Sequence, residues 1–257
     1  MYNFFKIDYQ HNRRLVQACG LVSIPDRRTF DRRLKTISID IKERIATMGR
    51  LFVAQGLVDP YITAIDSTLL KAKGHVWHKS SMTKGIVPRP GIDRDARWGF
   101  SHTRGWIFGY KLHITSTTGS LIVPLTADVT TANVADNQMY VSLRSTSIFH
   151  LQSCSYMAAD SGYDDHKLYN YSKQVLGIDL VCPIERYENT VSDRLELMHF
   201  YESILGQAIY NCRAISVEPL IEHIKSVFRL GPLPVYGFSS VSAIVLVCVF
   251  VSDNDIQ

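Results

Sequence analysis

The sequence predicts a mixed α/β fold in which helices flank a sheet and a small helical region comes first. Three patterns predict this fold. Apolar residues recur every three or four positions in residues 24–56, the spacing of amphipathic helices. Residues 105–136 alternate like two strands around a "TTGS" turn. Residues 154–184 follow the order strand, acid, helix, glycine and strand, which is typical of βαβ units.

The composition is that of a globular protein, with 46% hydrophobic and 20% charged residues in a chain of 257. Its five cysteines are odd in number and form no C-x-x-C pair. This argues against a disulfide framework or a thiolate zinc site and favours a reducing cytoplasm. The longest apolar stretch, residues 241–252, is too short to span a bilayer and predicts a buried core element.

Positive charge is concentrated in two segments, although the formal net charge is only +4. Residues 11–50 carry ten Lys and Arg against four Asp and Glu, and residues 67–111 carry nine against two. Clustered basic surface favours a polyanion such as nucleic acid. A solvated face on a mildly basic protein is the alternative.

The helical pattern of residues 24–56 predicts a basic helical region over residues 1–58. A small DNA-binding unit has this pattern, and so does any packed pair of helices. The run "YITAIDST" (61–68) then predicts a strand. Residues 69–105 have little periodicity, many Gly, Pro and Ser, and much positive charge, so we expect a long loop or basic insertion there.

Two further helices follow from the pattern. One is expected around residues 135–146. The other, within residues 216–230, has Ser216 as its expected N-cap and an apolar stripe facing the core. Glu218 and Lys225 lie on the edge of that stripe, because seven residues make nearly two full turns. Taken alone, these two side chains indicate an ordinary charged helix rim.

Two acids follow predicted strands directly. Asp66 closes "YITAI" and Asp160 closes "YMAA", and ligands of α/β sheets usually bind at the carboxyl ends of strands. If these strands are neighbours, the two carboxylates converge and repel each other unless a cation lies between them. Such oxygen ligands suit Mg²⁺ or Mn²⁺. With Glu218 as third ligand, two ions about 3.5–4 Å apart would clamp a phosphoryl displacement.

Each acid also has a purely structural interpretation. Asp66 could cap the segment after its strand, Asp160 could begin a turn with Gly162, and Glu218 could form a surface ion pair. For Asp164 and Asp165 the simpler expectation is the N-cap and first turn of the next helix, where acids complement the helix dipole.

Five stretches together resemble the DDE transposases of bacterial insertion sequences, in the group with a Tyr-Arg-Glu-Lys signature around the third acid. The resemblance covers most of residues 60–250. It rests on "AIDST" (64–68), "ARWGFSHTRGWIFGYKLHI" (96–114), "TADVTTANVADNQ" (126–138), "MAADSGYDD" (157–165) and "YNCRAISVEPLIEHIKSVFRLGPLPV" (210–235).

The resemblance implies a ribonuclease H-like fold with the order β1-β2-β3-α-β4-α-β5-α over residues 59–250. The sequence itself predicts a polar tail at 251–257. It implies that Asp66, Asp160 and Glu218 are catalytic and bind two Mg²⁺ or Mn²⁺ ions. The signature falls on Tyr210, Arg213, Glu218 and Lys225. The family usually has three residues between the arginine and the glutamate, whereas this chain has four.

The function that follows is metal-dependent DNA cleavage at the element's ends and strand transfer into target DNA, in the cytoplasm with the nucleoid. The expected partners are DNA and a second copy of the chain on paired ends, with no membrane. The residues expected to contact DNA are Tyr210, Arg213, Lys225, Lys111, Arg97, Arg104, Arg32 and Arg33, with His113 beside Lys111.

Two other functions remain compatible with the sequence. One is an inactive or truncated transposase remnant that only binds DNA. The other is a host nuclease of the same fold, which would cleave generic DNA. Cleavage at the boundary of the element distinguishes the three.

Overall fold

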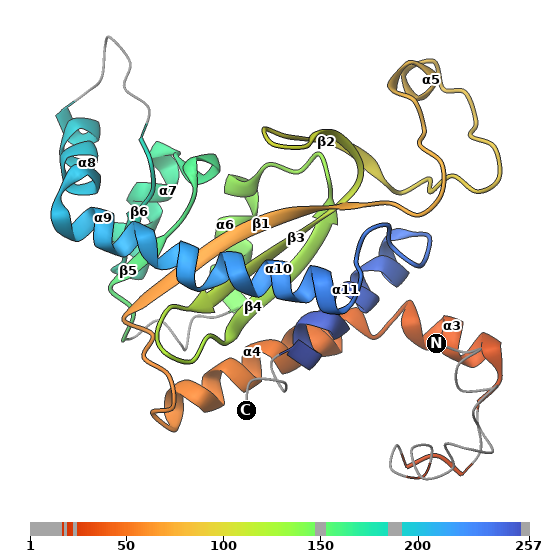
Figure 1. The fold of residues 1–257 in the computed structure, drawn as a ribbon, viewed down its shortest axis with the longest axis horizontal. Helices are drawn as coiled ribbons and strands as arrows, with labels where there is room; N and C mark the ends of the chain where they lie inside the picture. The colour runs from red at the N-terminus through yellow and green to blue at the C-terminus, as the bar shows by residue number, and fades with distance from the viewer. Residues whose placement is uncertain (1–16, 18–19, 23–24, 147–152, 185–191, 253–257) are drawn as a thin grey trace.

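The structure is a computed structural model that describes residues 17, 20–22, 25–146, 153–184 and 192–252 (Figure 1). Its centre is a single six-stranded sheet. The strands are β1 (Ile62–Lys71), β2 (Arg97–Ser101), β3 (Gly105–Thr117), β4 (Pro124–Thr131), β5 (Tyr156–Ala158) and β6 (Asp179–Val181).

The sheet is mixed, with the strand order β2-β3-β1-β5-β6 and β4 paired to β3. Strands β1, β2 and β4 all pair with β3 in antiparallel fashion. Strand β5 lies parallel to both β1 and β6. The parallel half is where crossover helices are needed, because a parallel connection cannot be made by a tight turn.

The helices follow the strands in the expected order. They are α3 (Arg27–Leu34), α4 (Ser38–Ala54), α5 (Lys79–Thr83), α6 (Asp136–Thr146), α7 (His166–Tyr171), α8 (Ser192–Glu202), α9 (Ile204–Asn211), α10 (Val217–Val227) and α11 (Phe238–Ser252). Shorter turns are η2 (Ser161–Tyr163), η3 (Ser172–Leu176) and η4 (Cys212–Ile215).

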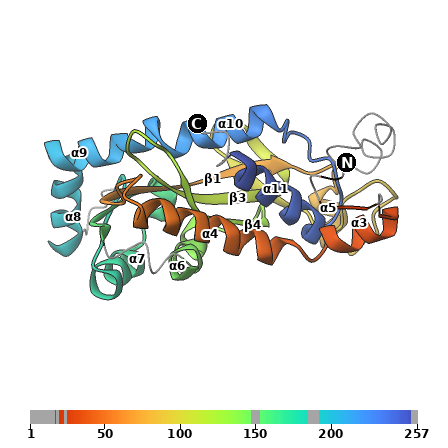
Figure 2. The same ribbon diagram turned by 90° about the horizontal axis from the view of Figure 1, so that it is seen from below.

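Helices cover both faces of the sheet, and Figure 2 shows α10 and the α6–α7 pair on opposite sides of it. Helices α4, α10 and α11 share one hydrophobic core with β1, β3 and β4. A second core joins α6 and α7 to β5 and β6. Strand β1 contributes to both, since Ala64 lies in the first core and Ile65 in the second. This is the two-residue alternation of a strand buried on both faces.

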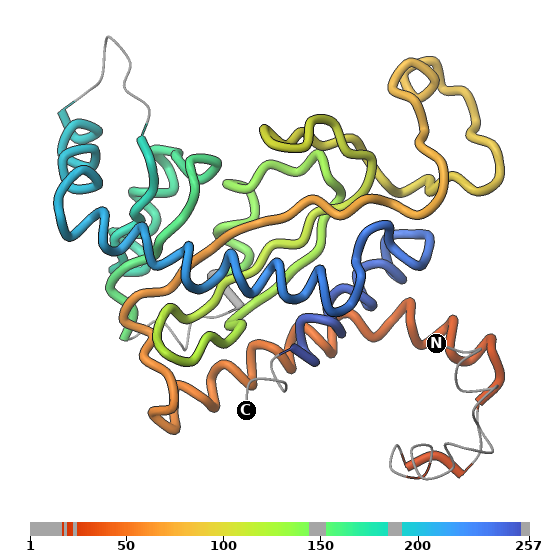
Figure 3. Tube along the Cα trace, in the orientation of Figure 1, coloured from red at the N-terminus to blue at the C-terminus, as the bar shows by residue number. Residues whose placement is uncertain are grey.

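The predicted insertion at 69–105 is partly wrong. Strand β1 continues to Lys71, and residues 97–101 form β2, which pairs with β3. Only residues 72–96 leave the sheet, and they carry α5 on the projecting arm that Figure 3 traces in yellow. The strand was missed because glycine interrupts its pattern: a Cβ at Gly99 would lie 2.3 Å from the carbonyl oxygen of Ala132.

The helix around the third acid has the predicted core stripe, in which Val217, Leu220, Ile221 and Ile224 are all buried. The predicted side-chain cap is wrong. Ser216 is the residue before the helix, but its hydroxyl donates backward to the carbonyl oxygen of Cys212 at 2.5 Å and caps no helical N–H.

The apolar segment at 241–252 is confirmed as a buried element. It lies in α11, where eight side chains are buried against α4 and β4. Within the described ranges, none of the helices is long and apolar enough to cross a membrane.

The strand and helix order therefore matches a ribonuclease H-like fold. Strand β2 is an additional short strand that pairs with β3, and β4 also pairs with β3. Helix α4 is not separate from this sheet, because it packs directly on β4 and α11, whereas α3 contacts α11.

Candidate active site

Asp66 and Asp160 lie at equivalent positions on neighbouring parallel strands. The last pair between β1 and β5 is Ala64 with Ala158, and each acid follows its member of that pair by two residues. The condition on which the two carboxylates were expected to converge, that these strands are neighbours, is therefore met.

The prediction that Asp66 closes its strand is wrong. Asp66 is paired with Ile114 of β3, and β1 continues for five more residues along that partner. Strand β5 ends sooner. Asp160 leaves the sheet and begins the turn η2, where its Oδ1 accepts a hydrogen bond from the N–H of Gly162 at 3.0 Å. Asp66 thus lies just beyond the point where β5 stops pairing with β1, while β3 still pairs with β1 on the other side.

Arg213 lies between the acids. Its Nη2 is 3.1 Å from Oδ2 of Asp66 and 3.5 Å from Oε1 of Glu218, and it also interacts electrostatically with Asp160. The guanidinium is buried, with 7% of the side chain exposed, whereas 47% of the Glu218 side chain is exposed. One cation therefore faces all three candidate carboxylates.

The extra residue between the arginine and the glutamate is accommodated by a break in the helix. An uninterrupted helix would turn residues 213 and 218 away from each other, because five residues span about 500°. Here Arg213 lies in the 3₁₀ turn η4, and Ser216 leaves helical geometry with φ −128° and ψ −90° before α10 begins. The break restores the contact between Arg213 and Glu218.

Burial dominates the electrostatics of the acids. It raises the pKa of Asp66 to about 6, with Arg213 opposing the rise and Asp160 and Glu218 adding to it. Burial also raises the pKa of Asp160, against the same arginine. For Arg213, burial favours the neutral form, but the surrounding carboxylates outweigh it and the pKa is raised. Burial therefore disfavours the charged forms of Asp66 and Asp160, and Arg213 offsets only part of that effect.

A second ion pair borders the acids on the opposite face of the sheet. Lys111 of β3 donates from Nζ to Oδ1 of Asp136 at 3.1 Å and to the carbonyl oxygen of Val134 at 2.9 Å. His113 lies 3.6 Å from the same carboxylate and 2.9 Å from the Thr130 hydroxyl. Burial lowers the pKa of His113, which favours the neutral imidazole.

Asp136 was not singled out by the sequence. A Cβ at Gly162 would lie 3.1 Å from Oδ1 of Asp160 and 3.2 Å from Oδ2 of Asp136, so both carboxylates flank this glycine. As the first residue of α6, Asp136 is indistinguishable in sequence from an acid that complements a helix dipole. Only the fold shows that it is next to Asp160.

The signature residues differ in how close they lie to the acids. Tyr210 of α9 contacts Arg213, whose Nη1 donates to the tyrosine hydroxyl at 3.3 Å. Lys225 lies about 10 Å along α10 from Glu218, and its ion-pair partner is Glu222.

The predicted DNA contacts outside the signature are spread over two regions. Arg104 reaches back from the β2–β3 turn to the carbonyl oxygen of Leu69, 3.2 Å away and three residues beyond Asp66. Arg97 donates to two backbone carbonyls of its own segment. Arg32 and Arg33 are exposed in the last turn of α3.

The two neighbouring acids have different roles. Asp165 is the N-cap of α7 and accepts from the N–H of Lys167, so an acid at the N-cap is confirmed, whereas the expected acid in the first turn is wrong. Asp164 forms an ion pair with Arg194 of α8.

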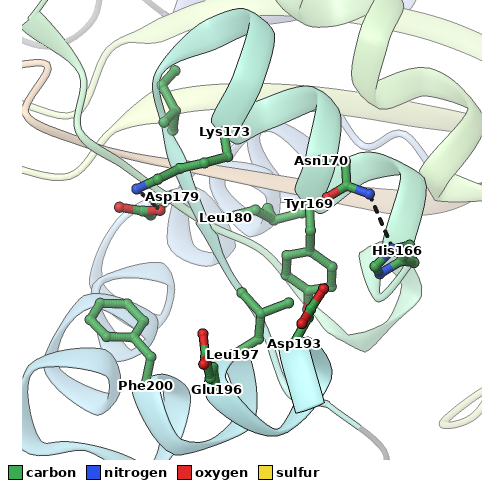
Figure 4. Close-up of a pocket in the computed structure, with 11 residues that line it drawn as sticks. His166, Tyr169, Asn170, Lys173, Asp179, Leu180, Asp193, Glu196, Leu197 and Phe200 are labelled. Carbon is green, nitrogen blue, oxygen red and sulfur yellow. Dashed lines mark hydrogen bonds and ion pairs between the residues drawn. The ribbon is translucent and has the colours of Figure 1, made fainter. Parts of the chain in front are cut away.

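A pocket lies away from the three candidate acids. It has a volume of about 330 Å³ and opens between α7, β6 and α8, and none of the three acids lines it (Figure 4). Its polar rim includes His166, Asp193 and the Lys173–Asp179 ion pair. Among the described residues, no three His, Cys, Asp or Glu side chains are grouped closely enough to hold a metal ion in this arrangement, in which Arg213 faces the acids.

Two comparisons with known proteins bear on this site. The family model described as "Transposase DDE domain" matches residues 58–252, which include Asp66, Asp160 and Glu218. No protein with a curated description matches the chain. Because the family match spans most of the chain and agrees with the strand order described above, this protein belongs to the DDE transposase family.

Proposed function

We propose that this protein cuts DNA at the ends of its own insertion element and joins the freed ends to target DNA, using Asp66, Asp160 and Glu218 as its catalytic carboxylates. Membership of the family supports DNA cleavage and transfer. The observation that carries the residue assignment is the register of Asp66 with Asp160, together with the convergence of Glu218 on the same arginine.

The chemistry of these side chains fits a divalent metal. Carboxylate oxygens are the ligands that Mg²⁺ and Mn²⁺ prefer. Burial raises the pKa of Asp66 in spite of Arg213, and a bound cation would favour its ionised form. When bound, two such ions would polarise the reacting phosphate and lower the pKa of the attacking water.

The chain's own residues would bind and orient the DNA. In the first step a water oxygen attacks the phosphorus at the element boundary, and the bond to the 3′ oxygen breaks to leave a 3′-hydroxyl. In the second, that hydroxyl attacks a target phosphorus and releases a target 3′-hydroxyl. Arg213 and Tyr210 would contact the reacting phosphate, and Lys225 a phosphate further along the strand.

Basic residues outside the signature would hold the DNA on either side. Lys111 and Arg104 are the nearest candidates, since Lys111 adjoins the Asp136–Asp160 region and Arg104 lies beside β1 beyond Asp66. Arg97, Arg32 and Arg33 would contact more distant phosphates. A homodimer on paired ends completes the proposal, because two ends must be joined together.

The test is strand cleavage of a DNA fragment that carries the gene's own flanks, with Mg²⁺, Mn²⁺ or EDTA. Wild-type protein is compared with Asp160→Asn and with Asp179→Asn, a matched change in an acid on β6 outside the site. We expect metal-dependent nicking at the element boundary by the wild type and the Asp179 variant, and none by Asp160→Asn.

Two other outcomes would contradict the proposal. If Asp160→Asn cuts as well as the wild type, the residue assignment is wrong. If folded wild-type protein binds the flanks and never cuts them, the protein is a DNA-binding remnant.

A further inference from the structure

A surface groove of about 500 Å³ lies where the arm returns to the sheet, and none of the three candidate acids lines it. We call it the distal groove. It is lined by Lys35, residues 89–95 and residues 236–240. It therefore joins the end of α3, the base of the arm and the start of α11, which lie at the same end of the molecule in Figures 1 and 2.

The cations of the distal groove face solvent. Lys35, Arg89 and Arg94 are all exposed, and none of them forms an ion pair within the described part of the chain. Arginine and lysine in this state are available to phosphate oxygens.

The groove's two acids are already bound to the backbone. Oδ2 of Asp93 accepts from the N–H of Gly237 at 3.0 Å, and Oδ2 of Asp95 accepts from the N–H of Phe238 at 2.9 Å. These N–H groups begin α11, where the helix dipole favours negative charge. The acids thus fix the arm to α11 and oppose the exposed cations less than free carboxylates would.

Two glycines line the groove beside these cations and acids. Gly91 and Gly237 both have left-handed backbone geometry, with φ of 86° and 84°. A Cβ at Gly91 would meet no other atom within 4 Å. A polymer backbone can therefore approach the main chain closely at Gly91.

The groove is connected to the acids through β1. The N–H of Leu233, just before the groove's residues 236–240, donates to the carbonyl oxygen of Lys71 at 2.9 Å. Lys71 follows Asp66 by five residues, about 16 Å along the strand. That length corresponds to roughly five base pairs of duplex at about 3.4 Å each.

We propose that the distal groove binds the sugar–phosphate backbone of the element's end, roughly five or more base pairs from the cleaved phosphate. This rests on the proposed function, since it assumes that the acids receive the end of the same duplex. The charge of the groove favours DNA over a second copy of the chain as its occupant. Exposed cations in three places along an open groove match the repeating charges of a DNA strand.

The test measures binding of the full-length protein to a duplex with the gene's flank, without divalent metal, across a range of salt concentrations. Arg89→Gln/Arg94→Gln is compared with Lys167→Gln/Lys173→Gln, which removes two exposed cations near α7. We expect the groove variant to lower the slope of log K against log salt by about 2, at about 0.9 for each phosphate. The control variant should leave the slope unchanged, and Lys35→Gln should lower it by about 1.

A second measurement locates the contact. Single phosphates of the duplex are replaced one at a time by uncharged methylphosphonates. We expect one stretch, beginning roughly five base pairs from the boundary, where the replacement weakens binding by the wild type and has no further effect on the groove variant.

Three outcomes overturn the proposal. In the first, the groove variant has the same salt slope as the wild type. In the second, methylphosphonate replacement weakens DNA binding by the groove variant as much as by the wild type. In the third, the DNA-free groove variant sediments differently from the wild type while its DNA affinity is unchanged. The last would assign the groove to a contact with a second copy of the chain. Because no step requires cleavage, a protein that binds through the groove and never cuts would refute the proposed function alone.

Discussion

Nη2 of Arg213 lies 3.1 Å from Oδ2 of Asp66, and the same guanidinium faces Glu218. A buried arginine therefore stands as the counter-charge to acids that the family match places in a transposase domain. Arginine is also the side chain best suited to bidentate phosphate binding. The same group can serve the acids in the DNA-free protein and a phosphate in the complex, but not both fully at once.

The first prediction is that Arg213→Gln strengthens Mn²⁺ binding to the DNA-free protein. Removing the guanidinium leaves the carboxylates without their competing cation, so the affinity should rise by about tenfold or more, as about 1.4 kcal/mol of lost competition implies. Titration calorimetry, or the loss of the electron paramagnetic resonance signal of free Mn²⁺, measures this affinity. Strand cleavage should fall in the same variant, because the phosphate contact is lost.

Lys225→Gln is the matched control for charge. Lys225 pairs with Glu222, outside the acid cluster, so its removal should leave the Mn²⁺ affinity unchanged. An Arg213→Gln protein that keeps its fold and binds Mn²⁺ no more tightly than the wild type would show that the arginine does not compete with metal.

The second prediction concerns stability and pH. Burial raises the pKa of Asp66 to about 6 in the folded protein, from the ordinary value of 3.8 that applies to the unfolded chain. The folded state thus binds more protons than the unfolded state between these values, and the free energy of unfolding falls as pH rises from about 4 to about 6. Asp66→Asn removes this loss. It should stabilise the metal-free protein at pH 7 by up to about 3 kcal/mol.

Urea denaturation at pH 7 and below pH 4 checks the sign. The difference between Asp66→Asn and the wild type should be positive at pH 7 and vanish at the lower pH. Asp179→Asn serves as the control, because this acid on β6 lies outside the cluster. A destabilised Asp66→Asn protein at pH 7 would mean that the ion pair with Arg213 outweighs the burial of the carboxylate.

Much of the fold followed from the sequence because its elements have strong periodicity. The stripe of α10 and the strand–acid–helix alternation around Asp160 both came from local patterns that survive in the structure. The proximity of Asp66 and Asp160 followed from one further assumption, that β1 and β5 are neighbours, which the register confirms.

The remainder depends on contacts between distant segments. Asp136 adjoins Asp160 through Gly162, and no local pattern encodes that approach. The position of Arg213 depends on a break at Ser216 that the helical pattern conceals. Strand β2 lacks a clear alternation because Gly99 lies against Ala132, where a side chain has no room.

The third prediction tests the Lys111–Asp136 pair by a double-mutant cycle. Lys111→Met leaves Asp136 next to Asp160 without its cation, so it should cost about 1–3 kcal/mol of unfolding free energy. Asp136→Asn should cost less, because the remaining lysine is attracted to Asp160. The double variant should be more stable than the sum of the single changes predicts.

Lys42→Met gives the comparison, because the Lys42–Asp128 pair between α4 and β4 is more exposed on the lysine side, at 32% against 11% for Lys111. It should cost no more than about 1 kcal/mol. Additive effects at Lys111 and Asp136, measured by urea denaturation, would rule out the coupling.

The fourth prediction concerns the bend that brings the β2–β3 hairpin over β1. A Cβ at Gly109 would lie 1.9 Å from the carbonyl oxygen of Leu70, a backbone atom that cannot turn aside. Gly109→Ala must push β3 away from β1 and should cost about 1–3 kcal/mol or more. Gly119→Ala is the matched control, because nothing lies within 4 Å of its position. The hairpin carries Arg104 to the backbone of β1 at Leu69, three residues beyond Asp66, so Gly109→Ala should also weaken DNA binding at a temperature where the protein is still folded. Equal urea midpoints for the two alanine variants would show that β3 moves freely at this crossing and that the hairpin's position does not depend on glycine.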